Sequence, residues 1–294
     1  MKPALRPAAA IFAAFMPALV WASGLSAANF VWSVQAENGA RAYLMGSIHL
    51  AHESLYPLAD PILAAFAASQ TLVVEINTVD LDPAHLNSFI SRHGLAKDGR
   101  PLAERLTPET ARLLKASGRE TPQMTFLAPW LAALKVQMEA LTANGYQPQY
   151  GLDLYFINQA KTRRRPIIEL ETLEEQMSVF TNMSEAQADL FLRVSLLEAA
   201  ALPDVTADLF EAWRRGDPEA FADCFFREYD KYPELTPMLD QLIFRRNERM
   251  FEKIERLMSD RSFSGFIVVG AGHLPGPEGL IAKFNKKNYS LTQL

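Results

Sequence analysis

Cysteine is almost absent from this sequence, since Cys224 is the only one in 294 residues. A single cysteine cannot form an internal disulfide, and its position far from the N-terminus excludes a lipid-modified cysteine behind an export signal. The fold must therefore be held together by its apolar core. We expect Cys224 to serve there as a small buried hydrophobic residue.

Long apolar runs are lacking everywhere except near the N-terminus. Lys2 and Arg6 precede an almost wholly apolar stretch over residues 8–21, and small residues follow up to Ala28. This order predicts a secretory signal peptide over residues 1–28. The alternative is an uncleaved membrane anchor, but the stretch is shorter than the roughly 20 residues of a spanning helix. We expect residues 29–294 to be exported, to the periplasm or beyond, with no membrane-spanning segment left after cleavage.

Basic residues are too few for a nucleic-acid partner. Residues 29–294 hold 27 Lys and Arg against 34 Asp and Glu, a net charge of −7. Nucleic-acid-binding domains present a basic face, which this balance does not supply. The sequence contains no indication of an oligomeric state.

Histidine is scarce as well, but two of the five histidines close the same local pattern. Gly46-Ser-Ile-His49 and Gly270-Ala-Gly-His273 each follow a short apolar run of the kind that forms a buried, parallel strand. Ligands of α/β proteins bind beyond the carboxyl ends of such strands. We therefore expect the fold to bring these two turns together around a functional site. Either histidine alone has a simpler interpretation, a structural hydrogen bond to the backbone.

Strand patterns occur at both ends of the chain. The runs 30–35 and 41–45 flank Asn38-Gly39, which is typical of a β-hairpin. Helical spacing of apolar residues prevails from about residue 100 to 258. The predicted fold is α/β, with a central mixed, largely parallel sheet built from N- and C-terminal segments and flanked by helices. Residues 29–294 would form one domain, with a large helical insertion at about 100–258.

Glu75 is an acidic residue in a strand otherwise built for burial, after Thr71-Leu-Val-Val. A buried carboxylate needs a cation, a metal ion or neutralisation. Glu75 could instead end the strand at the surface and pair with a lysine. With His49 and His273 it would form a three-ligand set that leaves a coordination position for water.

Two further residues are candidates for catalysis. Glu171 closes the apolar run 167–170 and is a candidate general base, whereas Arg246 is a candidate to stabilise negative charge on a substrate oxygen. The alternatives are a carboxylate at a helix start and a solvated charged helix face. His52 lies three residues after His49 and would either support the site or lie on the surface. Asp153 would either support the site or open its helix.

Six segments taken in order resemble the TraB/PrgY/GumN family across about residues 30–294. Paired Gly-x-x-His motifs also mark the animal Tiki proteins of that group, which are described as metal-dependent proteases. The segments that carry the resemblance are Gly46-Ser-Ile-His49, Leu72-Val-Val-Glu75, Gly151-Leu-Asp153, Leu170-Glu171-Thr172 with Gln176, Arg246-Asn247 and Val269-Gly-Ala-Gly-His273.

The resemblance implies that His49, Glu75 and His273 surround a divalent metal ion, manganese or cobalt, with zinc as an alternative. Asp153, Gln176 and Asn247 match further family positions and are expected to support the site. No organic cofactor is expected in this interpretation.

The predicted function is an exported metal-dependent hydrolase, in particular a peptidase acting on a peptide or protein substrate. A metal-bound water would be its nucleophile. Two alternatives stay open at this point. The histidines could bind haem or a small molecule without turnover, or the chain could be a non-catalytic interaction protein.

Overall fold

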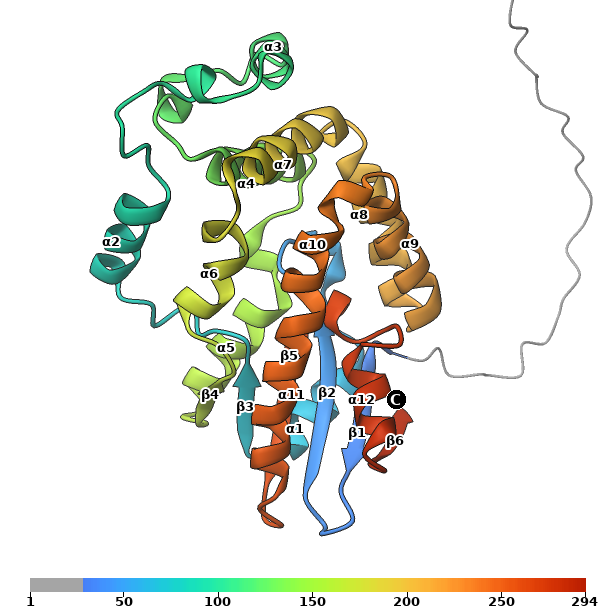
Figure 1. Ribbon diagram of the computed structural model, residues 1–294. Coiled ribbons are helices and arrows are strands. Elements are labelled where there is room, and N and C mark those ends of the chain that lie inside the picture. The colour runs from blue at the N-terminus through green and yellow to red at the C-terminus, as the bar shows by residue number, and fades with distance from the viewer. Residues whose placement is uncertain (1–28) are drawn as a thin grey trace, which may run out of the picture.

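The computed structural model describes residues 29–294, so the predicted signal peptide lies outside the described residues. The chain forms a sheet layer and, beyond one end of the sheet, a helical lobe (Figure 1). None of the helices within residues 29–294 combines the length and apolar character that a bilayer crossing would demand.

Over residues 29–294, the sheet layer contains six strands in the order β4-β3-β5-β2-β1-β6. β2 to β5 form a parallel block, and β1 pairs antiparallel with β2 and with β6. The predicted mixed, largely parallel sheet from both ends of the chain is confirmed. The strands are β1 (Val31–Gln35), β2 (Arg41–Ser47), β3 (Thr71–Val74), β4 (Ile167–Glu169), β5 (Ser264–Gly270) and β6 (Ser290–Gln293).

The pairing of β2 with β5 fixes the position of the two histidine turns. In this parallel pair Gly46 is opposite Val269 and Ser47 is opposite Gly270, so both strands end at the same edge of the sheet. β2 reaches this place through the predicted hairpin, in which Gly39 adopts a φ of 96°. Such a positive φ suits glycine because it has no Cβ.

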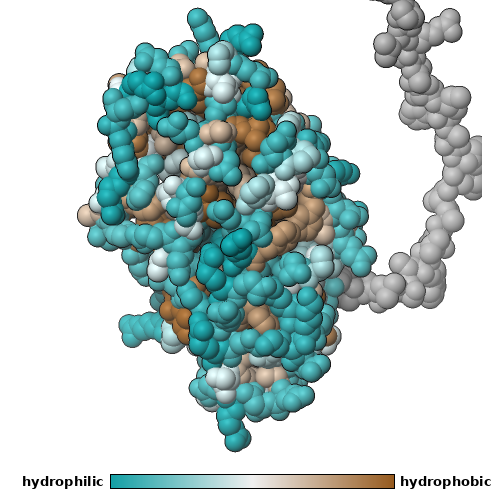
Figure 2. All heavy atoms as spheres, viewed as in Figure 1, coloured by the Kyte–Doolittle hydropathy of each residue, from teal (hydrophilic) through white to brown (hydrophobic). Residues whose placement is uncertain are grey.

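Four helices cover the two faces of the sheet. Phe66 of α1 (Asp60–Ala68) and Phe156 of α5 (Leu152–Thr162) pack on Phe266 of β5, which places both helices on one face. On the other face, α11 (Arg245–Met258) packs beside α12 (Leu280–Lys286). Figure 1 shows this second pair in front of the sheet, and the outward surface over α11 is mostly hydrophilic in Figure 2. The resulting core is the larger of the two main apolar clusters among the described residues.

The helical lobe lies over the end of the sheet to which β2, β3 and β5 lead (Figure 1). It has a core of its own, formed chiefly between α4, α6 and α7. α7 begins with the capping box of Ser184 and Gln187. The segment 100–258 is not purely helical, because it returns to the sheet once to contribute β4. The helices of the lobe are α2 (Pro83–His93), α3 (Pro108–Ala116), α4 (Pro129–Thr142), α6 (Leu173–Thr181), α7 (Glu185–Glu198), α8 (Leu202–Arg214), α9 (Pro218–Asp230) and α10 (Thr236–Leu239).

A π-helical segment, Asp240–Phe244, joins α10 to α11. Such wider turns are rare and frequently occur at functional sites. The Arg246 guanidinium Nη1 donates a hydrogen bond to the Leu242 carbonyl at 3.1 Å across this segment. Arg246 and Asn247 follow directly in the first turn of α11, and both side chains are buried.

Candidate functional site

The side chains of His49, Glu75 and His273 converge above Gly270. A Cβ atom built on Gly270 would lie 3.3 Å from both Glu75 Oε1 and His49 Nε2, and 3.4 Å from His273 Cδ2. A side chain at this position would crowd the space that the three groups share, which glycine leaves open. The two histidine turns thus meet as the sequence predicts, and Glu75 lies beside them.

Glu75 follows β3 directly and is buried, with 6% of its surface exposed. Its Oε1 accepts the Gly270 N–H at 2.5 Å and faces His273 Nε2 at 3.6 Å. Its Oε2 accepts hydrogen bonds from Arg246 Nη2 at 2.5 Å and from Gln176 Nε2 at 3.0 Å. Burial by itself would raise the pKa of Glu75, but His273 and Arg246 outweigh it and hold that pKa well below its usual range.

Arg246 lies between two carboxylates. Its Nε is 3.0 Å from each carboxylate oxygen of Glu171, and its Nη2 is 2.6 Å from Glu171 Oε2. All three side chains are almost fully buried. Burial would lower the pKa of Arg246, yet Glu75 and Glu171 raise it, so the guanidinium stays charged. Glu171 is not among the residues that line the cavity.

His273 is held by Asn247. Asn247 Oδ1 lies 2.7 Å from His273 Nδ1, and Asn247 Nδ2 donates to the carbonyls of His273 and Glu278. An amide oxygen only accepts, so Nδ1 carries the proton and Nε2 presents its lone pair toward Glu75. Burial lowers the pKa of His273 to about 4, although the Glu75 carboxylate opposes the shift. The imidazole is therefore neutral at pH 7.

His49 is held by Asp153, at the start of α5. Asp153 Oδ1 lies 3.1 Å from His49 Nδ1 and accepts the Ser47 hydroxyl at 3.1 Å. In return Ser47 Oγ accepts the Asp153 N–H at 3.1 Å. Unlike that of His273, the His49 side chain is 53% exposed. Desolvation would lower its pKa, but the Asp153 carboxylate outweighs this and raises the pKa of His49 to about 9.

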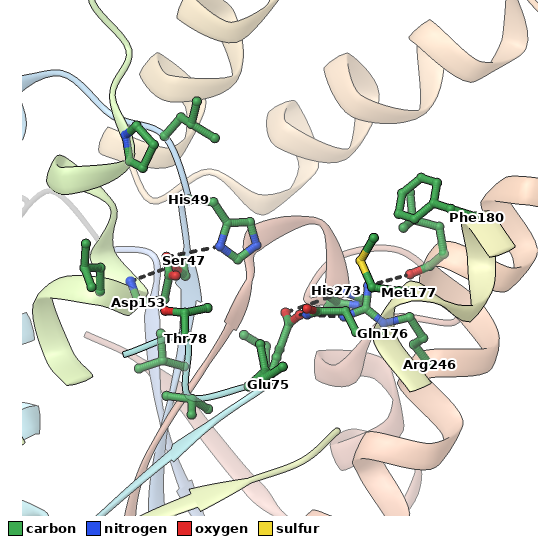
Figure 3. Close-up of a pocket in the computed structure, with 18 of the residues that line it drawn as sticks. Ser47, His49, Glu75, Thr78, Asp153, Gln176, Met177, Phe180, Arg246 and His273 are labelled. Atoms are coloured by element: carbon green, nitrogen blue, oxygen red, sulfur yellow. Dashed lines mark hydrogen bonds and ion pairs between the residues drawn. The ribbon is translucent and has the colours of Figure 1, made fainter. Parts of the chain in front are cut away.

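These residues border a cavity of about 460 Å³ between the sheet and the helical lobe. In Figure 3, His49 and Asp153 lie on one side, Met177, Phe180 and Arg246 lie on the other, and Glu75 and His273 lie between them. Of the predicted residues, six line the cavity: His49, Glu75, Asp153, Gln176, Arg246 and His273.

Three predicted residues do not line it. Asn247 and Glu171 lie behind the lining and contact it through His273 and Arg246. His52 is directed elsewhere, because its Nε2 is 2.9 Å from the Asn144 carbonyl and its ring packs edge-on against Tyr146. His52 therefore has a local structural role in the loop that precedes η1 (Glu53–Leu55).

Two sets of cavity residues were not predicted from the sequence. The first is Ser47, which lies inside the first Gly-x-x-His pattern. Its hydroxyl, next to a candidate ligand, could have indicated a polar role in the site. The apolar lining gave no such signal, because most of its residues follow ordinary helical spacing like those of any core, and the others lie in loops that follow a strand. They include Leu50, Ile76, Met138, Leu154, Met177, Phe180 and Leu242.

The chemistry of the donors suits a divalent cation. Each imidazole is hydrogen-bonded at Nδ1 and leaves Nε2 toward the cavity, as in metal-ligating histidines. Glu75 Oε1 adds a carboxylate oxygen next to them. Within residues 29–294, no three His, Cys, Asp or Glu side chains are already spaced as a metal-binding cluster. His49, Glu75 and His273 would therefore have to draw together to hold an ion.

A largely parallel sheet with two oriented imidazoles and a buried carboxylate at its strand ends defines an α/β protein with a polar site at one edge of the sheet. The sequence model of the TraB/PrgY/gumN family matches residues 30–293, so the chain belongs to this family.

Curated relatives are similar over part of the chain. Uncharacterized protein YbaP of Shigella flexneri is 25% identical over 175 residues, which are 56% of this chain and 62% of that protein. YbaP of Escherichia coli (strain K12) is 26% identical over 49% of this chain and 53% of its own length. A protein named metalloprotease TIKI homolog, from Amphimedon queenslandica, is 26% identical over 49% of this chain and 32% of its own length. The matches thus span half to about three fifths of the two YbaP proteins, and no solved structure matches the chain.

Proposed function

We propose that this chain is an exported, metal-dependent hydrolase that cleaves peptide bonds. The observation that carries the proposal is the convergence of His49, Glu75 and His273 on the space above Gly270. The relative named as a metalloprotease supports the choice of a peptide substrate. Neither a buried core histidine nor a surface ion pair explains why two imidazoles and a carboxylate share this point.

His49 and His273 would hold the ion through Nε2, and Glu75 would hold it through Oε1. A bound divalent ion lowers the pKa of its water and polarises a substrate carbonyl. Asp153 and Asn247 fix the two rings in the tautomer that leaves Nε2 free. Gln176 and Arg246 hold the other oxygen of Glu75 and keep this carboxylate charged.

The contacts of Arg246 suggest a revised division of roles. Its guanidinium is already bound to Glu75 and Glu171, so we infer that it positions Glu75 instead of binding a substrate oxygen. Glu171 in turn offsets the charge of Arg246. This ion pair leaves Glu171 poorly placed to accept a proton. Asp153 is the better candidate for general base, because both hydrogen bonds of its carboxylate use Oδ1 and the residue lines the cavity.

The proposal is tested by measuring metal content and peptide hydrolysis together. The full chain, purified without chelator, is compared with the double variant His49→Ala/His273→Ala. We expect about one divalent ion per wild-type chain, hydrolysis of unstructured peptides that chelator abolishes, and loss of both in the variant. The matched control is His52→Ala/His85→Ala, which removes two histidines that do not line the cavity. Equal metal content in the wild type and in the His49→Ala/His273→Ala variant would contradict the proposal.

The same protein preparations address the alternatives. An intense visible absorption band in the purified protein would favour haem binding over hydrolysis. Export is tested separately by determining the N-terminus of protein recovered outside the cytoplasm, where the signal-peptide prediction places it at residue 29.

A further inference from the structure

The cavity has two unlike halves. The polar half comes from the ends of β2, β3 and β5 and from α5. The other half comes mainly from the helical lobe. Apart from Gln176 and Arg246, which both hydrogen-bond Glu75, it presents apolar side chains. We call four of these the apolar wall: Met138 of α4, Met177 and Phe180 of α6, and Leu242 of the π-helical segment.

The apolar wall is uncovered on its cavity side. Met138 is 41% exposed, one of the few large apolar side chains so exposed among the described residues. Met177, Phe180 and Leu242 are partly buried. An apolar surface that faces a polar site instead of packing against protein is available to a ligand.

The wall is supported from behind. The Phe180 ring stacks on Trp130 at 5.8 Å and on Phe191 at 5.9 Å, between ring centroids. Met177 and Leu242 pack against the same helical core. A rigid aromatic ring therefore lies beside two methionines, whose flexible side chains adapt to ligands of different shape.

The charged groups of the cavity are already bound to protein. Arg246 pairs with Glu75 and Glu171, and Asp153 bonds Ser47 and His49. The charge that His49 carries in the metal-free protein is paired with Asp153, and both side chains lie on the side of the cavity opposite Met177 and Phe180 (Figure 3). In the part of the chain that the structure describes, no other Lys, Arg, Asp or Glu lines the space. A charged substrate group next to the wall would lose hydration without gaining a partner, which is costly.

From these observations we infer that the apolar wall is a subsite for an uncharged, apolar side chain of the substrate, beside the bond to be cleaved. That the bond is cleaved rests on the proposed function, whereas recognition of the side chain does not. The two methionines predict tolerance among leucine, methionine and phenylalanine side chains. They also predict rejection of acidic and basic ones.

Binding of three end-blocked pentapeptides tests the subsite. Each consists of alanines around a central leucine, aspartate or lysine, and affinity is measured by calorimetry on the full chain with chelator present. We expect the leucine peptide to bind about 10- to 100-fold more tightly than the other two, from the burial of one apolar side chain. Equal affinities, tighter binding of a charged peptide, or no binding of the leucine peptide would overturn the inference.

A matched pair of variants locates the effect. Met138→Lys places a cation in the wall at a position that is 41% exposed. It should weaken binding of the leucine peptide at least about tenfold and strengthen binding of the aspartate peptide. Leu197→Lys makes a comparable change at a side chain that is 50% exposed and outside the cavity, and it should alter neither affinity. If both variants weaken leucine binding equally, the subsite is not at the wall.

Hydrolysis of longer, internally quenched versions of the same peptides separates this inference from the proposed function. Selective binding without cleavage, whichever divalent ion is added, would refute the hydrolase and leave the subsite intact. Cleavage at equal rates for the three central residues would refute the subsite and leave the hydrolase intact.

Discussion

The two Gly-x-x-His turns share a pattern in the sequence but differ in their surroundings. His273 is buried and bound to the neutral amide of Asn247, whereas His49 is half exposed and bound to the Asp153 carboxylate. The consequence is a pKa of about 4 for His273 and about 9 for His49. Without a bound metal, one imidazole is neutral and the other is charged at pH 7. A repeated motif can thus supply two groups of opposite character.

The buried surroundings of His273 depend on Arg246, because this residue holds the Glu75 carboxylate beside His273. Arg246→Ala would leave two buried carboxylates without the guanidinium that hydrogen-bonds both of them, so we expect a loss of about 3–5 kcal/mol in the free energy of unfolding, measured by urea titration. Arg245→Ala is the matched control. Its side chain is 69% exposed and pairs with Asp240 at the surface, which predicts a loss of about 0–1 kcal/mol. Similar losses for the two variants would contradict the buried role of Arg246.

The opposite pKa shifts predict opposite pH dependences in the metal-free protein. For His273 the folded pKa is the lower one, so the unfolded chain takes up a proton first. Stability then falls by about 3 kcal/mol as the pH drops from 6.5 to 4. For His49 the folded pKa is the higher one, so its contribution is complete below pH 6.5 and is lost as the pH rises to 9. Solvent screening makes this second effect smaller.

Urea titrations from pH 4.5 to 9, with chelator present, measure how the free energy of unfolding changes with pH on the acid side and on the alkaline side. His273→Asn should flatten the acid side of the stability curve, and His49→Asn should flatten the alkaline side. A variant that changes the slope on the other side would show that the two environments have been assigned the wrong way round.

Periodicity and turn chemistry were enough to predict much of the fold. Apolar runs at both ends of the chain, the Asn38-Gly39 turn and the glycines before each histidine predicted the sheet and its ligand-facing edge. The pairing of Ser47 with Gly270 follows from that prediction, because parallel strands share their carboxyl end. Glu75 was recognisable because a carboxylate after a buried run needs a partner.

The partners of these residues were harder to predict. Arg246 is 171 positions from Glu75, and Asp153 is 104 positions from His49. No local pattern encodes such contacts, so Arg246 was predicted to face a substrate although it is bound to two carboxylates. The apolar wall was hidden for another reason, because Met177 and Phe180 have the same helical spacing as residues that only pack a core.

Asp153 and Asn247, which hydrogen-bond the two histidines, allow a third test of how the two turns differ. The quantity measured is the affinity for a divalent metal ion, and the expected effects are smaller. Asp153→Asn keeps the size of the side chain but removes the charge that raises the basicity of His49, and we expect about tenfold weaker binding. Asn247→Leu also frees the carbonyls of His273 and Glu278, so we expect about 100-fold weaker binding. Titration against a competing chelator measures both constants.

A control for these two variants lies on the same helix as Asp153. Asn158→Ala, at an exposed position of α5, should leave the affinity unchanged. If Asp153→Asn and Asn247→Leu also leave it unchanged, then the two side chains do not orient metal ligands.

The smallest expected effect is that of Ser47, which joins the first turn to α5. Ser47→Ala removes the hydroxyl that donates to Asp153 Oδ1 and accepts the Asp153 N–H. Each of these two hydrogen bonds has a net contribution of about 0.5–1 kcal/mol, so the loss of stability should be about 1–2 kcal/mol. Because Asp153 would still face His49, metal affinity should fall only a few-fold. Ser33→Ala on β1, away from the cavity, is the control for serine removal from a strand. A loss of metal affinity as large as that of Asp153→Asn would mean that Ser47, and not the charge of Asp153, keeps His49 in place.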